Sequence, residues 1–211
     1  MHLRTYSGKD YVFWECPNCS SVVQALIEQS NLPVKANKPF SALEVTPNNQ
    51  TLLSDMKAVF NKRDLLTKGS WFLYGKTGCG KTFHASVFGH QLIRMHGLAV
   101  RFIQVSEHLN NLKRLFRLRN HDEYETEDPG GLLLRIKEAK VLIMDDINRR
   151  YTEFEIETLY DIIDYRYRNK LFTVFTAQTK DLEMLPEQTV SRISDMAFPY
   201  YLGGTNRRRT F

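Results

Sequence analysis

The chain has 211 residues, 42% of them hydrophobic and 25% charged, which allows one ordinary globular domain with a short appendage or two very small domains. No stretch approaches the roughly eighteen consecutive apolar residues of a membrane helix, and the first residues lack the apolar stretch of a signal peptide. Three cysteines are too few for a disulfide framework, so we expect a cytosolic protein, and the net charge of +5 favours a polyanionic partner.

Residues 1–47 differ in pattern from the rest of the chain and form a short N-terminal segment in our prediction. They contain the pair Cys16-Pro17-Asn18-Cys19, an apolar helical stretch over Val22–Ile27, and then three prolines at loop spacing. Cys16 and Cys19 supply two of the four ligands of a structural zinc site, and His2 could be a third. Zinc binding is therefore one hypothesis. A decayed site, or two cysteines packed under the neighbouring aromatic residues, is the alternative.

Residues 48–211 predict a single α/β domain. Short apolar strands alternate with amphipathic helices, a pattern typical of a parallel sheet covered on both faces. The expected strands are Ser70–Tyr74, Leu98–Val105, Lys140–Met144, Leu171–Ala177 and Ala197–Leu202. The expected helices cover about residues 50–62, a stretch ending at His96, residues 106–119, a short stretch after Pro129, residues 152–169 and residues 188–195. Gly97 suits a helix C′ position, Ser106 an N-cap, and Thr152-Glu153-Phe154-Glu155 a capping box.

The run Gly75-Lys76-Thr77-Gly78-Cys79-Gly80-Lys81-Thr82 follows the first of these strands and opens a helix. Its glycines allow the backbone to fold so tightly that successive N–H groups point at phosphate oxygens, aided by the dipole of the following helix. We expect Lys81 to reach the β- and γ-phosphates and Thr82 to ligate Mg²⁺. The run is therefore a P-loop that binds ATP, with Cys79 as a small loop residue.

A second half of the site follows from the strand Lys140–Met144, which ends in Asp145 and Asp146 as a Walker B strand does. Asp145 is expected to hold Mg²⁺, chiefly through water, because Mg²⁺ keeps much of its hydration shell. Asp146 is expected to polarise the attacking water. Phosphoryl transfer also needs positive charge at the γ-phosphate, commonly an arginine from a neighbouring subunit, and Arg192 is a candidate. The alternative for Arg192 is an ordinary surface arginine.

Together these elements resemble the AAA+ ATPases of the DnaC/DnaI helicase-loader and IstB group, over roughly residues 40–211. The matching stretches are Asn31-Leu32-Pro33 with Lys38-Pro39-Phe40, the run from Ala99 to Leu109, the Walker B strand, Thr176-Ala177-Gln178 at sensor 1, Ser191-Arg192 at the arginine finger, and Gly203-Gly204-Thr205-Asn206-Arg207 at a terminal G-x-x-x-R motif. The resemblance gives Gln178 and Arg207 roles at the nucleotide. The chain then stops without the helical lid of other AAA+ proteins.

The resemblance implies a five-stranded parallel sheet in the order 5-1-4-3-2, ATP at a subunit interface, and a homo-oligomeric ring or spiral. It also implies single-stranded DNA inside that assembly and a hexameric replicative helicase as client. The helix at 106–119 carries Lys113, Arg114 and Arg117 away from its apolar face, which suits contact with a phosphate backbone.

Two departures bear on rate. Gln178 stands where the group usually carries Asn, and Asp146 where it usually carries Glu, so we expect slow hydrolysis. A further departure is the short front segment, where the loaders have an extended helicase-binding domain. The first hypothesis is a helicase loader of the small phage or mobile-element kind. The alternatives are an IstB-like transposition ATPase on duplex DNA, which recruits a transposase, and an ATP-sensing adaptor that barely hydrolyses.

Overall fold

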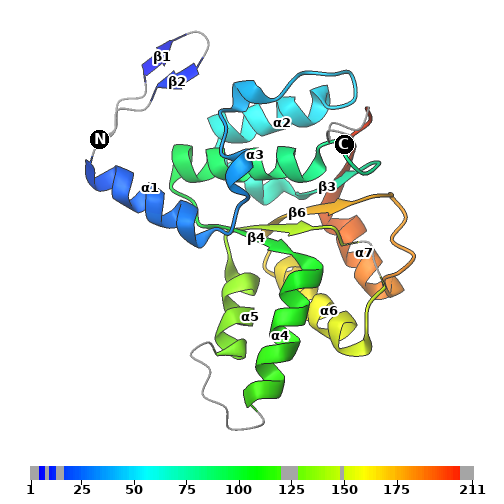
Figure 1. Ribbon diagram of the computed structural model, residues 1–211. Coiled ribbons are helices and arrows are strands. Elements are labelled where there is room, and N and C mark those ends of the chain that lie inside the picture. Colours follow the sequence, from blue (N-terminus) through cyan, green and yellow to red (C-terminus); the bar gives the residue numbers. More distant parts are fainter. Residues whose placement is uncertain (1–4, 8–9, 13–16, 120–127, 148–149, 205–211) are drawn as a thin grey trace, which may run out of the picture.

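A computed structural model describes residues 5–7, 10–12, 17–119, 128–147 and 150–204. Its centre is a five-stranded sheet (Figure 1). The strands are β3 (Ser70–Tyr74), β4 (Val100–Gln104), β5 (Val141–Asp145), β6 (Phe172–Ala177) and β7 (Ala197–Tyr201). Every pairing is parallel, in the order β4-β5-β6-β3-β7. Read from β7 in chain order of the five strands, this is 5-1-4-3-2, so the predicted topology is confirmed.

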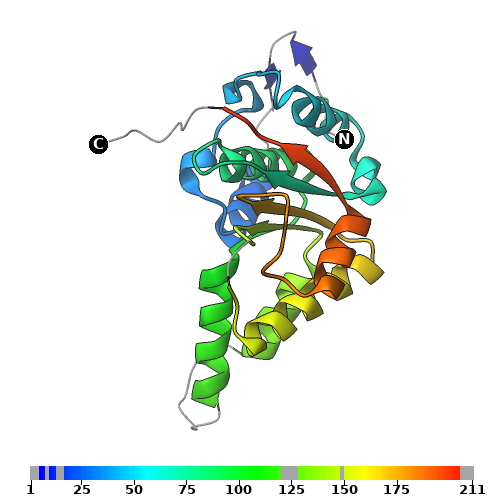
Figure 2. The same ribbon diagram turned by 90° about the vertical axis from the view of Figure 1, so that its right-hand side faces the viewer.

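Helices cover both faces of the sheet, as the strand pattern predicts. One face carries α1 (Pro17–Gln29), α2 (Gln50–Asn61) and α3 (Lys81–His96), and the other carries α4 (Val105–Arg119), α5 (Pro129–Glu138), α6 (Glu153–Arg168) and α7 (Glu187–Met196) (Figures 1 and 2). Short 3-10 turns at Val34–Ala36, Phe40–Ala42 and Arg63–Lys68 connect the first elements, and Thr5–Ser7 (β1) pairs antiparallel with Asp10–Val12 (β2). None of the described helices is long and apolar enough to cross a membrane.

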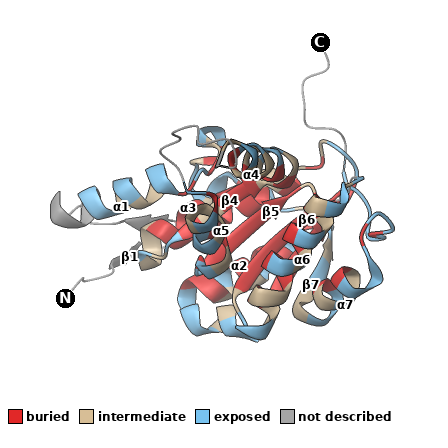
Figure 3. Ribbon diagram, turned by 90° about the horizontal axis from the view of Figure 1, so that it is seen from below, coloured by how far each residue is buried: buried red, intermediate tan, exposed pale blue. Residues whose placement is uncertain are grey.

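Two hydrophobic cores lie on the two faces, because successive side chains of a strand point to opposite sides. Trp71 and Leu73 of β3 join the core under α2 and α3, whereas Phe72 between them joins the core under α4 to α7. The sheet is buried throughout its middle strands, and exposed residues lie on the outer faces of the helices (Figure 3).

The segment before residue 47 also contributes to the first core. Leu32, Ala36 and Leu43 are buried there, and the backbone N–H of Phe102 on β4 donates to the carbonyl oxygen of Ser30 at 2.7 Å. The helix predicted at Val22–Ile27 is longer than expected, since α1 spans Pro17–Gln29. Our division of the chain at residue 47 stays a prediction, since side chains between Val23 and Leu43 pack in the first core of the ATPase domain.

Two of the three predicted helix ends are confirmed and one is wrong. Gly97 has φ of 60° and ends α3, and Glu155 Oε2 accepts from the N–H of Thr152 at 2.7 Å in a capping box. α4, however, starts directly at Val105. Gln104 caps it, because its Oε1 accepts from the N–H of Glu107 at 2.9 Å and from the Ser106 hydroxyl at 2.7 Å. Glutamine is an uncommon N-cap, which is why the sequence favoured Ser106.

A buried arginine fixes α6 against its neighbours. Arg166 has no exposed surface, and its guanidinium donates to the carbonyl oxygens of Lys137, Ala139 and Phe172 and to the Thr173 hydroxyl at 2.6–2.8 Å. Burial lowers the pKa of Arg166 to about 9. These bonds join the end of α5, α6 and the start of β6. They therefore fix the position of α6 and of the side chains on its outer surface.

Candidate nucleotide-binding site

The P-loop lies between β3 and α3, at the carboxyl end of the sheet. Gly75 has φ of 148°, and a Cβ there would lie 2.2 Å from the carbonyl oxygen of Leu202. Gly80, with φ of 98°, is the N-cap of α3. Both positions require glycine, because other residues rarely adopt such backbone angles. The loop therefore has the tight backbone that a phosphate-binding site needs, directly at a helix N-terminus.

Lys81 lies over this loop. Its side chain is largely buried, and Nζ donates to the carbonyl oxygens of Gly75 at 2.7 Å and Lys76 at 3.1 Å. The loop carbonyls thus hold the ammonium group within the loop, the position from which a lysine of this motif reaches the phosphates of a nucleotide.

Three side chains from three elements meet beside the P-loop. Asp145, the last residue of β5, accepts on Oδ1 from the Thr82 hydroxyl at 2.8 Å and from the Thr176 hydroxyl of β6 at 2.6 Å. Burial raises the pKa of Asp145, and the two hydrogen bonds act in the opposite direction because they stabilise the carboxylate. The structure thus brings Thr82 and Asp145, the two residues expected at Mg²⁺, within hydrogen-bond distance of each other.

Asp146 takes a left-handed backbone conformation with φ of 59°. Its N–H donates to the Thr176 hydroxyl at 3.0 Å, and the N–H of Ile147 donates to the Thr176 carbonyl oxygen at 3.0 Å. Positive φ is uncommon outside glycine, although Asp tolerates it better than most residues. Thr176 therefore fixes both the carboxylate of Asp145 and the turn that follows it.

A buried histidine joins the P-loop to the segment before α2. His84 Nδ1 lies 2.8 Å from the Gly80 carbonyl oxygen, and its Nε2 lies 3.1 Å from Asn49 Nδ2. Because an amide nitrogen can only donate, Nε2 accepts and Nδ1 donates. Asn49 Oδ1 in turn accepts from the N–H of Thr46 at 2.8 Å. The spacing of the histidines along the chain does not indicate this contact, because only the fold brings His84 and Asn49 together.

Among proteins of curated function, a sequence comparison finds no match. Residues 23–184, however, match the family described as IstB-like ATP binding protein. The chain belongs to this family. It is therefore a P-loop ATPase, in agreement with the resemblance drawn from its motifs.

Solved structures share the fold of this IstB-like ATPase. The crystal structure of the DnaC helicase loader has 19% sequence identity and a TM-score of 0.69, covering 81% of this chain and all of that one. The crystal structure of DnaI has 20% identity and a TM-score of 0.66, covering 85% and 95% of the two chains. The replication initiator DnaA bound to AMPPCP and single-stranded DNA has 16% identity and a TM-score of 0.67, covering 84% and 53%.

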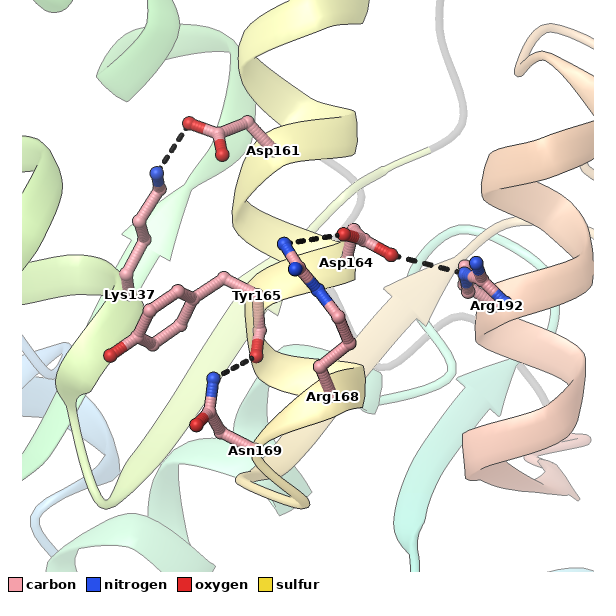
Figure 4. Close-up of polar contacts among 7 residues, drawn as sticks. All are labelled: Lys137, Asp161, Asp164, Tyr165, Arg168, Asn169 and Arg192. Carbon is pink, nitrogen blue, oxygen red and sulfur yellow. Dashed lines mark hydrogen bonds and ion pairs between the residues drawn. The ribbon is translucent and has the colours of Figure 1, made fainter.

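Of the other predicted site residues of this IstB-like ATPase, Gln178 and Arg192 lie within the described part of the chain. Gln178 is exposed, directly after β6 and two residues beyond Thr176. Arg192 lies on α7 against α6, where its Nε donates to Asp164 Oδ1 at 3.1 Å (Figure 4). Arg207 and Cys16 lie outside the described residues, and the side chain of Cys19 is not described either, so their roles stay predictions.

The basic residues of α4 lie where the helical pattern predicts. Leu109, Leu112 and Leu115 are buried, whereas Arg114 and Arg117 are exposed and Lys113 is half-buried. The lower half of α4 extends away from the sheet (Figures 1 and 2).

The described residues contain no cluster of three or more His, Cys, Asp or Glu side chains that could hold a metal by themselves. Thr82 and Asp145 nevertheless fit Mg²⁺, which takes one or two protein oxygens and keeps several waters when it binds with a nucleotide. The residue that sequence reasoning missed here is Thr176 as a partner of Asp145. Its signal was a polar residue inside a buried strand, because buried hydroxyls need partners.

Proposed function

We propose that this IstB-like ATPase is an ATP-dependent loader that assembles as a ring or spiral, binds single-stranded DNA and delivers a hexameric replicative helicase. The observation that supports this most is the combination of an assembled Walker site with a fold that matches all of the solved chain of the DnaC helicase loader. ATP binding would order the assembly, and hydrolysis would release it.

The described residues suggest how hydrolysis proceeds. The N–H groups of the P-loop and the Lys81 ammonium would bind and orient the phosphates, and Thr82 with Asp145 would hold Mg²⁺. The metal would neutralise charge on the β- and γ-phosphate oxygens. Asp146 would orient the attacking water, with its backbone turn held by Thr176. Asp146 is one methylene shorter than glutamate, so we expect slow turnover.

Arg192 would complete the site of a neighbouring subunit. Its contacts lie on α6 rather than at the P-loop of its own chain, which supports a role across a subunit interface. Single-stranded DNA would lie along α4, where Lys113, Arg114 and Arg117 would contact its phosphates without reading bases.

The family match favours a second candidate. IstB is the name the family carries, so a transposition ATPase that assembles on duplex DNA and recruits a transposase uses the same site with another client. The exposed position of Gln178 supports the third possibility, an adaptor that senses ATP and turns it over slowly.

Affinity capture from the host cell separates these functions. The tagged wild-type chain is compared with Lys81→Ala, which loses the phosphate contact, and with Lys62→Ala, an exposed lysine outside the P-loop, as the matched control. A loader captures the hexameric helicase with ATP in the wild type and Lys62→Ala but not in Lys81→Ala. Capture of a transposase on duplex DNA, or of the helicase equally with and without ATP, would replace the first candidate by the second or third.

A further inference from the structure

Asp164 on α6 is a carboxylate shared by two arginines. Its Oδ2 lies 2.8 Å from Arg168 Nη2, and its Oδ1 accepts from Arg192 Nε at 3.1 Å (Figure 4). The carboxylate is mostly buried, with 14% of its side chain exposed, whereas the Arg168 side chain is 67% exposed. Asp164 thus shares one negative charge between two guanidinium groups.

The Arg192 guanidinium also lies over an aromatic ring. Its Cζ lies 4.7 Å from the centre of the Tyr167 ring, within the range of a cation–π contact. Asp164 and Tyr167 are three residues apart on α6, so they lie on the same side of that helix. One face of α6 thus holds the Arg192 guanidinium in two ways. Asp164 binds its edge, and the Tyr167 ring lies against its plane.

The contact with Asp164 leaves the two terminal nitrogens of the Arg192 guanidinium without a bond to the carboxylate. Asp164 binds Nε, the inner nitrogen, whereas the two terminal nitrogens carry four of the five N–H donors of an arginine. These terminal donors are the ones that bind a phosphate in an end-on, bidentate manner. Arg192 lines a surface hollow together with Tyr160 of α6 and with Glu187, Gln188 and Ser191 of α7. One further acid, Glu187, therefore faces this region.

We propose that Asp164, with the Tyr167 ring, is a positioning residue that presents Arg192 to the nucleotide of a neighbouring subunit. An unrestrained arginine would lose its rotamer freedom when it engages the phosphate, whereas a held one has lost it on folding. α6 is suited to this task because buried Arg166 and the apolar residues Leu159, Ile162 and Ile163 fix it to the sheet. The inference rests on the proposed role of Arg192 as a finger acting in trans.

The test is steady-state ATP turnover of the full chain, with nucleotide binding and thermal melting measured in parallel. Asp164→Ala should lower kcat about tenfold or more and leave the KM for ATP within about twofold, because binding does not use the finger. Asp164→Asn, which keeps an acceptor oxygen for Nε, should retain intermediate activity. Asp161→Ala is the matched control, because Asp161 lies one turn earlier on α6 and pairs with Lys137 instead (Figure 4). The kcat of Asp161→Ala should equal that of the wild type.

A double-mutant cycle separates positioning from simple support of the fold. In an Arg192→Lys background, which keeps the charge but lacks the planar fork, adding Asp164→Ala should lower kcat less than twofold further. A full additional loss, or a loss that follows the melting temperature in both Asp164 variants, would overturn the inference in favour of a structural ion pair. Wild-type kcat in Asp164→Ala while Arg192→Ala is inactive would overturn this inference alone. Wild-type kcat in Arg192→Ala would contradict the proposed role of Arg192 as the arginine finger.

Discussion

Thr176 is the residue whose hydroxyl joins the two acids of the site. Replacing it by valine keeps the shape and the strand preference but removes the bonds to Asp145 and to the Asp146 N–H. We expect turnover to fall about tenfold or more, since partners of metal-binding residues have effects of this size. Stability should fall by about 2 kcal/mol, because buried polar groups lose their partners. The acidic limb of the rate profile should also move to higher pH, since one cause that lowers the pKa of Asp145 is lost.

Thr189→Val is the matched control for this measurement. Thr189 on α7 is equally buried, but its hydroxyl has no hydrogen-bond partner among the described residues. Its replacement should leave turnover unchanged and stability unchanged or slightly higher. If Thr176→Val hydrolysed ATP at the rate of Thr189→Val, the hydroxyl network would have no part in catalysis.

His108 on α4 makes the fold sensitive to acid. Burial lowers its pKa from 6.5 to about 4, and no described group is a partner of its Nε2. Between these two values the unfolded chain binds the proton and the folded chain does not, so stability is lost as pH falls below 6.5. At pH 5 the loss from this group is about 2 kcal/mol. Denaturant unfolding at pH 7.5 and 5 should therefore show that His108→Leu loses about 2 kcal/mol less than wild type; equal losses would contradict this origin.

At the scale of the elements, α6 depends on Arg166. Its guanidinium donates to carbonyl oxygens at the end of α5 and at the start of β6. Arg166→Met keeps the apolar stem and leaves those carbonyls buried without a partner. We expect the free energy of unfolding to fall by about 3 kcal/mol or more. Arg168→Met on the same helix removes an exposed ion pair and should cost about 1 kcal/mol or less. Equal effects of the two substitutions would refute this role.

α4 is the element that we propose to bind DNA, and the contribution of its charge can be tested by varying the salt concentration. Fluorescence anisotropy on a labelled single strand, with ATP present, should show affinity that falls steeply with salt and depends little on sequence. Lys113→Ala/Arg117→Ala removes two phosphate contacts, so the slope of log K against log salt should flatten by about 1.4. Lys62→Ala is the control. A loss of affinity equal at every salt concentration would mean that this face of α4 touches no phosphate.

The elements themselves were largely predictable from sequence. The five strands and the helices of residues 48–204 end within one or two residues of their predicted limits, because apolar periodicity and turn residues define them. The residue that caps α4 was not predicted, since Gln104 caps the helix with a long side chain that is uncommon at this position. Partners of side chains were less accessible. The contacts of Thr176 with Asp145, of His84 with Asn49, and of Arg192 with Asp164 join residues 28–35 positions apart in the chain, and only the fold brings them together.

At the scale of the whole molecule, the proposed mechanism divides the active site between two parts of each chain. The P-loop, Asp145 and Thr176 lie at the carboxyl end of the sheet, and Arg192 lies on α7 against α6. In the proposed mechanism a chain completes its site only with a neighbour, which would link ATP hydrolysis to assembly. This link is what the proposed loader function requires, and it would serve a transposition ATPase equally well.

The most direct test of this central claim is ATP turnover in a mixture of two inactive variants. Lys81→Ala lacks the phosphate contact and Arg192→Ala lacks the finger, so neither should hydrolyse ATP alone. In an equimolar mixture, about a quarter of the interfaces join an intact P-loop to an intact finger, so turnover should return to about a quarter of the wild-type rate. No recovery at any ratio, in mixtures shown by cross-linking to co-assemble, would contradict a site shared between subunits.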